Sequence, residues 1–127
     1  MKLKFIKTVY AHCDLPCGVY DPSQARVEAL SIKAIMEKYD GLDDYNKTRA
    51  IIIKEQRAEL VKNHLMILWA DYFKEVHLEK FPNLHDLFWR TIKQASLCKS
   101  NNDVSNANKL IEMIDQIAEI FFETKKA

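Results

Sequence analysis

Only two glycines and three prolines interrupt the 127 residues of this chain, and four of these five stand before residue 42. So few residues that break regular structure leave little room for the tight turns of an all-β fold, and they favour long helices. Apolar side chains recur every three or four residues, as on one face of a helix, and no stretch alternates as a strand does. We therefore expect an all-α fold: an antiparallel up-down four-helix bundle with an irregular segment at its N-terminal end.

The first expected helix has recognisable signals at both ends. Asp21 is the expected N-cap, Pro22 the first helical residue, and Gln24, three residues after the cap, completes a variant of the capping box. The helix should end near Tyr39, where Gly41 would supply a left-handed cap.

Three further helices follow from the apolar pattern. The second should run from about residue 43 to about residue 74, and the third follows Pro82 and fades into the polar tract 99–102, which is expected to be a loop. The last helix has the cleanest apolar stripe, formed by Val104, Ala107, Ile111, Ile114, Ala118 and Phe121.

Charge and composition narrow the classes of function. Hydrophobic residues make up 48% of the chain, and 19 basic against 18 acidic residues give a formal charge of +1. The charges form no basic stripe, so nucleic acid is not an expected partner. No apolar run approaches the roughly 20 residues that span a bilayer, and Lys2, Lys4 and Lys7 interrupt any secretory signal. We expect a cytoplasmic protein with no membrane partner.

The segment from His12 to Tyr20, HCDLPCGVY, concentrates the side chains that can bind a metal. His12, Cys13 and Cys17 lie within six residues. A zinc site would need four Cys or His ligands, and the sequence contains no second pair of this kind. On residue types alone, a disulfide between Cys13 and Cys17 or a loop with idle thiols stays open beside metal binding.

A cut between Ala11 and His12 would change what this segment can bind. The new α-amine of His12 and the deprotonated backbone nitrogen of Cys13 would close a five-membered chelate ring on a metal. The thiolates of Cys13 and Cys17 would complete a plane beneath the His12 imidazole. Mixed nitrogen and sulfur donors in a plane suit Ni(II) or Cu(II), and two thiolates would reduce Cu(II). The donors therefore favour a nickel ion that cycles between Ni(II) and Ni(III).

The stretch HCDLPCGVYDP, from His12 to Pro22, resembles the nickel hook of nickel-containing superoxide dismutases, H-C-x-x-P-C-G-x-Y, at every position. The stretches TRAIIIKEQRAEL, WADYFK and ETKKA are similar to the family's bundle. The resemblance implies that a protease removes residues 1–11 as a leader. It also implies that residues 12–127 form one domain, with a hook (12–20) and a bundle (21–127). The mature protein would be a homohexamer with one nickel ion per subunit that converts superoxide to oxygen and hydrogen peroxide.

The resemblance also assigns roles to residues of the hook. It implies that nickel is bound by the amine and imidazole of His12, the backbone nitrogen and thiolate of Cys13, and the thiolate of Cys17. It further implies that Tyr20 stands beside the open face of the metal and that Asp14 helps to fix the loop. The sequence given still carries Met1 to Ala11, so this chain lacks the free amine and should be inactive until it is cut.

Two charged residues outside the hook also stand out. Glu28 lies on the apolar stripe of the first expected helix and Arg57 on that of the second, and charges on such stripes need partners. A structural ion pair is the common explanation for such a placement. The family resemblance implies instead a relay from Arg57 through Glu28 to the axial imidazole, which holds a ligand in place.

One alternative function belongs to another class. The chain could be a helical oligomeric binding module in which Cys13 and Cys17 form a redox switch or a nickel-storage site. Cys98 lies among apolar residues of the third expected helix and is assigned no chemistry.

Overall fold

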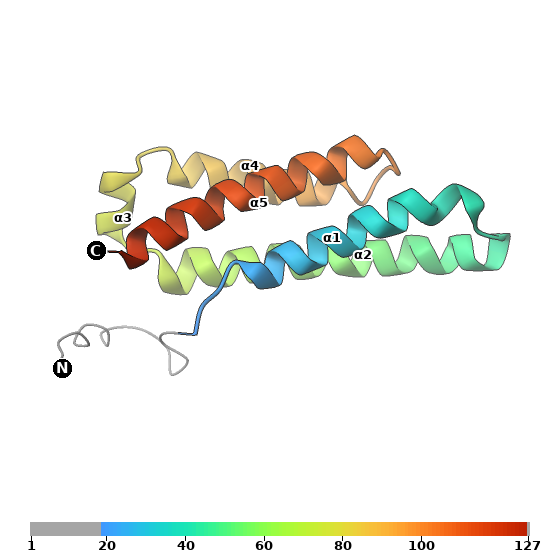
Figure 1. Ribbon diagram of the computed structural model, residues 1–127, viewed down its shortest axis with the longest axis horizontal. Helices are drawn as coiled ribbons and strands as arrows, with labels where there is room; N and C mark the ends of the chain where they lie inside the picture. The colour runs from blue at the N-terminus through green and yellow to red at the C-terminus, as the bar shows by residue number, and fades with distance from the viewer. Residues whose placement is uncertain (1–18, 127) are drawn as a thin grey trace.

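The computed structural model describes residues 19–126, and within them the backbone is entirely helices and turns (Figure 1). The α-helices are α1 (Ser23–Lys38), α2 (Asp44–Ile67), α3 (Glu75–Lys80), α4 (Leu84–Leu97) and α5 (Val104–Lys125). A 3₁₀ turn, η1 (Tyr39–Gly41), follows α1, and a π-helical turn, η2 (Leu68–Tyr72), follows α2.

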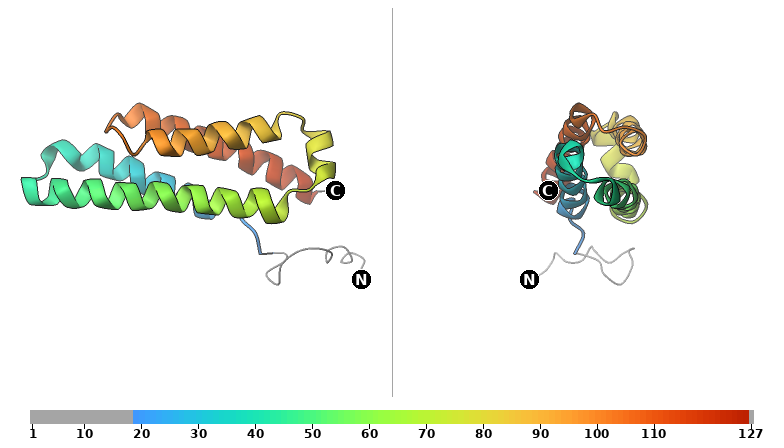
Figure 2. Two further views of the ribbon diagram at one scale, coloured as in Figure 1. Left: turned by 180° about the vertical axis from the view of Figure 1, so that it is seen from behind. Right: turned by 90° about the vertical axis from the view of Figure 1, so that its right-hand side faces the viewer.

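The four long helices lie along one axis in alternating directions (Figures 1 and 2). Helix α1 packs against α2 and α5, and α4 packs against the same two helices. The short helix α3 crosses one end of the bundle between α2 and α4, at the end where α5 finishes (Figure 1). The all-α, antiparallel up-down bundle is therefore confirmed. Helix α3 was not predicted, because six residues are too few to produce an apolar stripe.

The start of α1 differs in detail from the sequence prediction. The carboxylate of Asp21 accepts a hydrogen bond from the backbone N–H of Ser23 at 2.9 Å, so Asp21 does cap this end. The helix is assigned from Ser23, although Pro22 already has helical backbone angles. Gln24 forms no side-chain hydrogen bond within residues 19–126, so the prediction of a capping box was wrong.

The end of α1 also differs from the prediction. Gly41 does not adopt the left-handed conformation that we expected of it, and a Cβ atom at this position would meet no neighbour. The chain instead tightens into η1, where the N–H of Leu42 donates to the carbonyl oxygen of Tyr39 at 3.1 Å. A 3₁₀ turn thus satisfies a helix-end carbonyl without a residue of positive φ.

Helix α2 begins and ends with features that matter for the site. Asp43 caps its start, since its carboxylate accepts the N–H of Asn46 at 2.8 Å. Its regular hydrogen bonding stops at Ile67, and the chain continues through η2, where the N–H of Phe73 reaches back to the carbonyl of Leu68 at 3.0 Å. π-Helical turns inside or after α-helices are frequent at functional sites.

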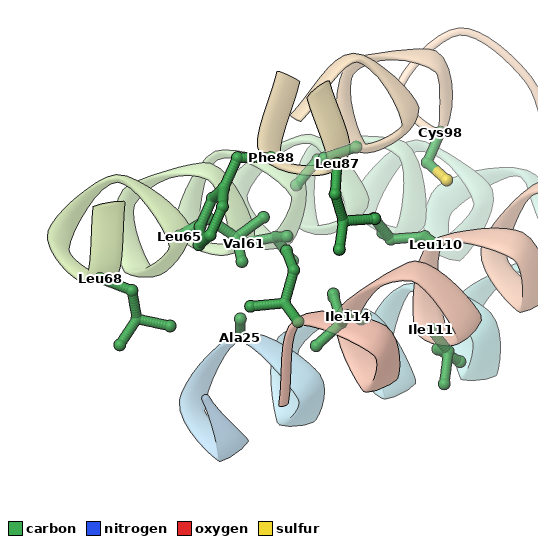
Figure 3. Packing of buried hydrophobic residues seen from close by; sticks show 14 of the residues in the cluster. Ala25, Val61, Leu65, Leu68, Leu87, Phe88, Cys98, Leu110, Ile111 and Ile114 are labelled. Atoms are coloured by element: carbon green, nitrogen blue, oxygen red, sulfur yellow. The ribbon is translucent and has the colours of Figure 1, made fainter. Parts of the chain in front are cut away.

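The core lies between the four long helices, and its described members run from Ala25 to Phe121. Side chains of α2 and α4 point toward those of α5 and α1, as Leu65, Phe88 and Ile114 do in Figure 3. Each of these large apolar side chains is at most 2% exposed, and the burial of each contributes about 1.5–3 kcal/mol to the stability of the fold. This burial between the long helices holds the bundle together, and Pro22, at the start of α1, is buried as well.

The polar tract 99–102 is a loop, as predicted, and a buried lysine fastens it to the bundle. Lys54 of α2 is only 3% exposed, and its ammonium donates to the backbone carbonyl of Asn101 and to the side-chain oxygen of Asn102. Burial lowers the pKa of Lys54, because leaving water disfavours its charged form. The two oxygen acceptors offset part of this cost and fix the loop between α4 and α5.

Candidate metal centre

The metal ligands expected from the sequence lie outside the described residues. His12, Cys13, Asp14 and Cys17, and the expected cleavage point after Ala11, all precede residue 19. Tyr20, the last residue of the hook, is described and forms its connection to the bundle. The structure therefore gives the surface to which the hook is attached.

Tyr20 is anchored at the end of the bundle that carries η2 and α3. Its side chain is half-buried and packs against the core. Its ring centroid lies 5.9 Å from that of Tyr72, with the two rings tilted by 56°. Such tilted aromatic pairs are favourable, so Tyr72 helps to set where the hook meets the bundle.

Glu28 and Arg57, which sequence reasoning singled out on separate helices, form an ion pair between α1 and α2. A terminal guanidinium nitrogen of Arg57 lies 2.9 Å from Oε1 of Glu28. The Glu28 side chain is 15% exposed and that of Arg57 is 41% exposed. Within residues 19–126, the second carboxylate oxygen of Glu28 has no hydrogen-bond partner. Glu28 can therefore still accept a hydrogen bond from a further group.

Tyr72, the last residue of η2, is a residue of this region to which sequence reasoning assigned no role. Its hydroxyl lies 2.7 Å from the hydroxyl of Thr124 in the last turn of α5. Thr124 already donates its one hydroxyl hydrogen to the carbonyl of Phe121 at 2.6 Å. Tyr72 must therefore be the donor to Thr124, and its oxygen can then only accept further hydrogen bonds. Burial raises the pKa of Tyr72, because leaving water disfavours its charged form.

Aromatic and basic side chains surround Tyr72. Its ring stacks on that of His77 at 5.8 Å and contacts that of Phe121 at 4.5 Å. The ammonium of Lys125 lies 5.4 Å from the centre of the Tyr72 ring. Tyr72, His77 and Lys125 did not stand out in the sequence, because their contacts join different elements and, for Lys125, elements that are far apart along the chain.

The three remaining histidines lie on different helices and make different contacts. Nδ1 of His77 accepts the N–H of Lys74 at 3.0 Å at the start of α3, and burial, helped by Lys74, lowers its pKa. His85 packs its ring against Trp69 of η2 at 5.4 Å. His64 lies on α2, seven residues after Arg57. In the part of the chain from 19 to 126, no three His, Cys, Asp or Glu side chains converge as a metal site would require.

Cys98 is buried at the end of α4 and belongs to the core. Burial raises the pKa of its thiol to about 11, against a smaller opposite effect of Lys54. Thiols react as thiolates, so Cys98 is protonated and unreactive near neutral pH. Among the helices of residues 19–126, none is long and apolar enough to cross a membrane.

Comparison with known proteins gives consistent matches over nearly the whole chain. Residues 7–125 match the family model of nickel-containing superoxide dismutase. The superoxide dismutase [Ni] of Streptomyces coelicolor is 57% identical over 121 residues, which cover 94% of this chain and 92% of that protein. The protein of the same name from Streptomyces seoulensis is 55% identical over 120 residues, with the same two coverages.

The fold also matches that of a solved structure. The native structure of a nickel superoxide dismutase superposes with a TM-score of 0.87 at 56% sequence identity. The match covers 91% of this chain and all of the other. The helices described above are therefore arranged as in that protein.

Proposed function

Because this chain belongs to the family of nickel-containing superoxide dismutases, we propose that it binds its metal in the hook, residues 12–20, and carries out its reaction there. The chain is an oxidoreductase that converts two superoxide ions and two protons into oxygen and hydrogen peroxide, and its cofactor is nickel. When bound, nickel supplies one-electron chemistry through its Ni(II) and Ni(III) states. The observation that carries the proposal is the segment HCDLPCGVY, which ends at the anchored Tyr20.

The proposed donors suit this metal. They are the α-amine and imidazole of His12, the backbone nitrogen and thiolate of Cys13, and the thiolate of Cys17. Thiolate and amide donors carry negative charge and favour the higher oxidation state of a metal that prefers mixed nitrogen and sulfur ligands. Because each chain has one such set of donors, it would bind one nickel ion per subunit.

Residues of the bundle would support the ligands from outside. Glu28 has a carboxylate oxygen without a partner in the range 19–126, and Arg57 holds the other oxygen at 2.9 Å. In our proposal the open oxygen accepts the ring N–H of His12 and so fixes the orientation of the imidazole. Groups that orient a ligand in this way commonly change metal affinity or activity by about 10–100-fold when removed.

Tyr20 and Asp14 are proposed to act at the hook itself. A tyrosine hydroxyl beside the metal can donate a hydrogen bond to water or to a small anion such as superoxide. The half-buried ring of Tyr20, held against Tyr72, gives that hydroxyl a defined position. Asp14 would fix the loop by accepting hydrogen bonds within it.

Activation is proposed to require cleavage between Ala11 and His12. Only the cut chain presents the α-amine of His12, so residues 1–11 would act as a leader and a processing protease as a partner. Residues 12–127 would then form the mature domain, with the hook at 12–20 and the bundle at 21–127. The uncut chain is proposed to be inactive.

We also propose a homohexamer in the cytoplasm. Several apolar side chains are exposed on the outer faces of α1, α2 and α5, among them Val27, Ile51, Ile52 and Phe122, which are 48–58% exposed. Apolar side chains gathered on an outer surface commonly mark protein contacts. The expected leader contains Lys2, Lys4 and Lys7, and these charges interrupt the continuous apolar segment that a secretory signal needs.

The test compares the chain that begins at His12 with a chain in which the bond after Ala11 cannot be cut. Both are given nickel, and dismutase activity and the paramagnetic signal of Ni(III) are measured. The cut chain should show both properties and the uncut chain neither. Cys13→Ser and Cys17→Ser should abolish them, while Cys98→Ala serves as the matched cysteine control. An active uncut chain, or an active Cys17→Ser variant, would refute the proposal.

A further inference from the structure

A pocket with a partly polar lining opens at the point where Tyr20 meets the bundle. It has a volume of about 190 Å³ and is lined by the turn 19–21, by Gln24 of α1, and by His64, Ile67 and Leu68 where α2 passes into η2. A water molecule takes about 30 Å³ in the liquid, so a pocket of this size holds several. The polar side chains of its lining give such water the two to four partners that keep a water ordered.

His64, on the lining of this pocket, has a buried ring nitrogen without a protein partner. Its Nδ1 atom is shielded from solvent and forms no hydrogen bond within residues 19–126. Tyr20 and Gln24 line the same pocket and carry hydrogen-bond donors, but neither of them is bonded to Nδ1. A buried polar atom left without a partner costs about as much as a lost hydrogen bond, and ordered water commonly satisfies such atoms. Water in the pocket is therefore the partner that fits Nδ1.

The reaction needs protons, and His64 is suited to supply them. Converting two superoxide ions into oxygen and hydrogen peroxide consumes two protons. Histidine is the side chain that both holds and releases a proton near neutral pH. The other titratable side chains of the lining are the phenol of Tyr20 and the carboxylate of Asp21, which accepts the N–H of Ser23 at 2.9 Å. His64 is only half-buried, so it can recover a proton from solvent.

We propose that His64 and the water of this pocket deliver protons to the hydroxyl of Tyr20, and through it to superoxide as it is reduced. The imidazolium releases its Nδ1 proton to the water, the water passes a proton to the Tyr20 oxygen, and the hydroxyl hydrogen of Tyr20 goes to the reduced substrate. Superoxide gains one electron from nickel and two protons, one by this route and one from solvent, which gives hydrogen peroxide. Tyr20 ends with a hydrogen as before, and His64 is protonated again by solvent.

The inference rests on the proposed place of Tyr20 beside the metal and adds a source for the proton that Tyr20 gives. His64 acts through water and Tyr20, not by contact with the substrate. Proton supply can be told from a purely structural role, because only a missing proton source can be replaced by a proton donor in solution.

A crystal structure of the uncut, metal-free chain tests the water directly. Ordered water should lie within about 3.2 Å of Nδ1 of His64. If a protein group, from Tyr20, Gln24 or any other part of the chain, occupies that position instead, the inference is wrong. This test needs neither nickel nor cleavage.

Kinetics of the processed, nickel-loaded His64→Ala variant test the proton supply. The value of kcat should fall by about 100-fold, the lower end of what a positioned acid or base contributes. The value of kcat/KM should stay within twofold, because it reports encounter and a first half-reaction that takes up no proton. Added imidazole should restore part of kcat, since it fits the space left by the side chain. The control His85→Ala removes a histidine that contacts Trp69 outside the pocket lining, and it should keep kcat.

His64→Gln separates proton supply from hydrogen bonding alone. Its amide can bond the pocket water but does not exchange a proton near neutral pH, so this variant should lose kcat as well. A His64→Gln variant that keeps kcat would mean that His64 only orders its neighbours, and the inference would fail. It would also fail if His64→Ala keeps kcat within twofold or if imidazole restores nothing. Circular dichroism checks folding, and if His64→Ala does not fold, His64→Gln decides alone.

Failure here can be separated from failure of the proposed function. Nickel content and dismutase activity of the unchanged processed chain test the hook as a metal site. The kcat of the His64 variants tests only the proton route. An active enzyme whose His64→Ala variant keeps kcat would retain the first proposal and refute the second.

Discussion

Replacement of Glu28 by glutamine tests whether the ion pair between α1 and α2 serves the metal or only the fold. Glutamine keeps the size of the side chain and removes its charge, so the bond to Arg57 weakens without a cavity. Arg57 is 41% exposed and can turn to water, so the free energy of unfolding should fall by only about 1 kcal/mol. Loss of the group that orients a metal ligand should instead lower nickel affinity or activity by about 10–100-fold.

The chain provides a matched control for this experiment. Arg26 and Asp115 form an ion pair at 2.7 Å that also ties α1 to a neighbouring helix, in this case α5. Both side chains are exposed to a similar degree, 43% and 45%, so Asp115→Asn should cost no more stability than Glu28→Gln. Asp115 pairs with Arg26 and shares no residue with the Glu28–Arg57 pair, so its replacement should leave nickel binding unchanged.

The assay follows both properties in the processed protein. Urea unfolding of the metal-free variants gives stability, and the rate of nickel loss to a chelator, together with dismutase activity, reports on the site. Glu28→Gln should lose nickel faster at nearly unchanged stability. The reasoning fails if Glu28→Gln stays within twofold of the unchanged protein in both measurements, or if Asp115→Asn matches its loss.

Three further predictions follow from single contacts. Thr124→Val removes the acceptor of the Tyr72 hydroxyl and should cost about 1 kcal/mol in urea unfolding, whereas Thr124→Ser keeps the acceptor and the stability; equal losses in the two variants would refute a stabilising bond. Cys98 should resist alkylation at pH 8 until the protein unfolds, while the two hook cysteines react, and mass analysis distinguishes them. His77 has a folded-state pKa below its unfolded value of about 6.5, so its contribution to stability is complete above that pH and is lost as pH falls through the lower folded value. Unfolding measured from pH 8 to 4 should show this slope, and His77→Gln should reduce it.

Much of the bundle could be predicted because its long helices present apolar stripes. The stripe of α5 places Ala107, Ile111 and Ile114 on the buried face, and the structure buries all three. Gly41 misled the prediction because a glycine after a helix indicates where the chain turns but does not determine which turn forms. Helix α3 is held by a local bond from Lys74 to His77, which leaves no periodic signal.

Residues around the site could be predicted only where a charged side chain lies on an otherwise apolar face of a helix. Glu28 and Arg57 stand out in the sequence for that reason, and they do pair across α1 and α2. Tyr72 could not be found in this way, because a tyrosine ring is not out of place among apolar side chains. Its partner Thr124 is 52 residues away, and only the meeting of η2 with the end of α5 brings them together.

The position of the core bears on the order in which this enzyme folds, is cut and acquires nickel in the cell. Within residues 19–126, the buried core runs from Ala25 to Phe121 and is built from the helices and the turns that join them, and Tyr20 of the hook packs against its edge. We therefore expect the uncut, metal-free chain to fold, unlike small domains whose fold depends on a structural metal. Synthesis can run ahead of metal supply and accumulate a folded reserve. The supply of nickel and the rate of cleavage, not the rate of folding, would then set how much of that reserve becomes enzyme.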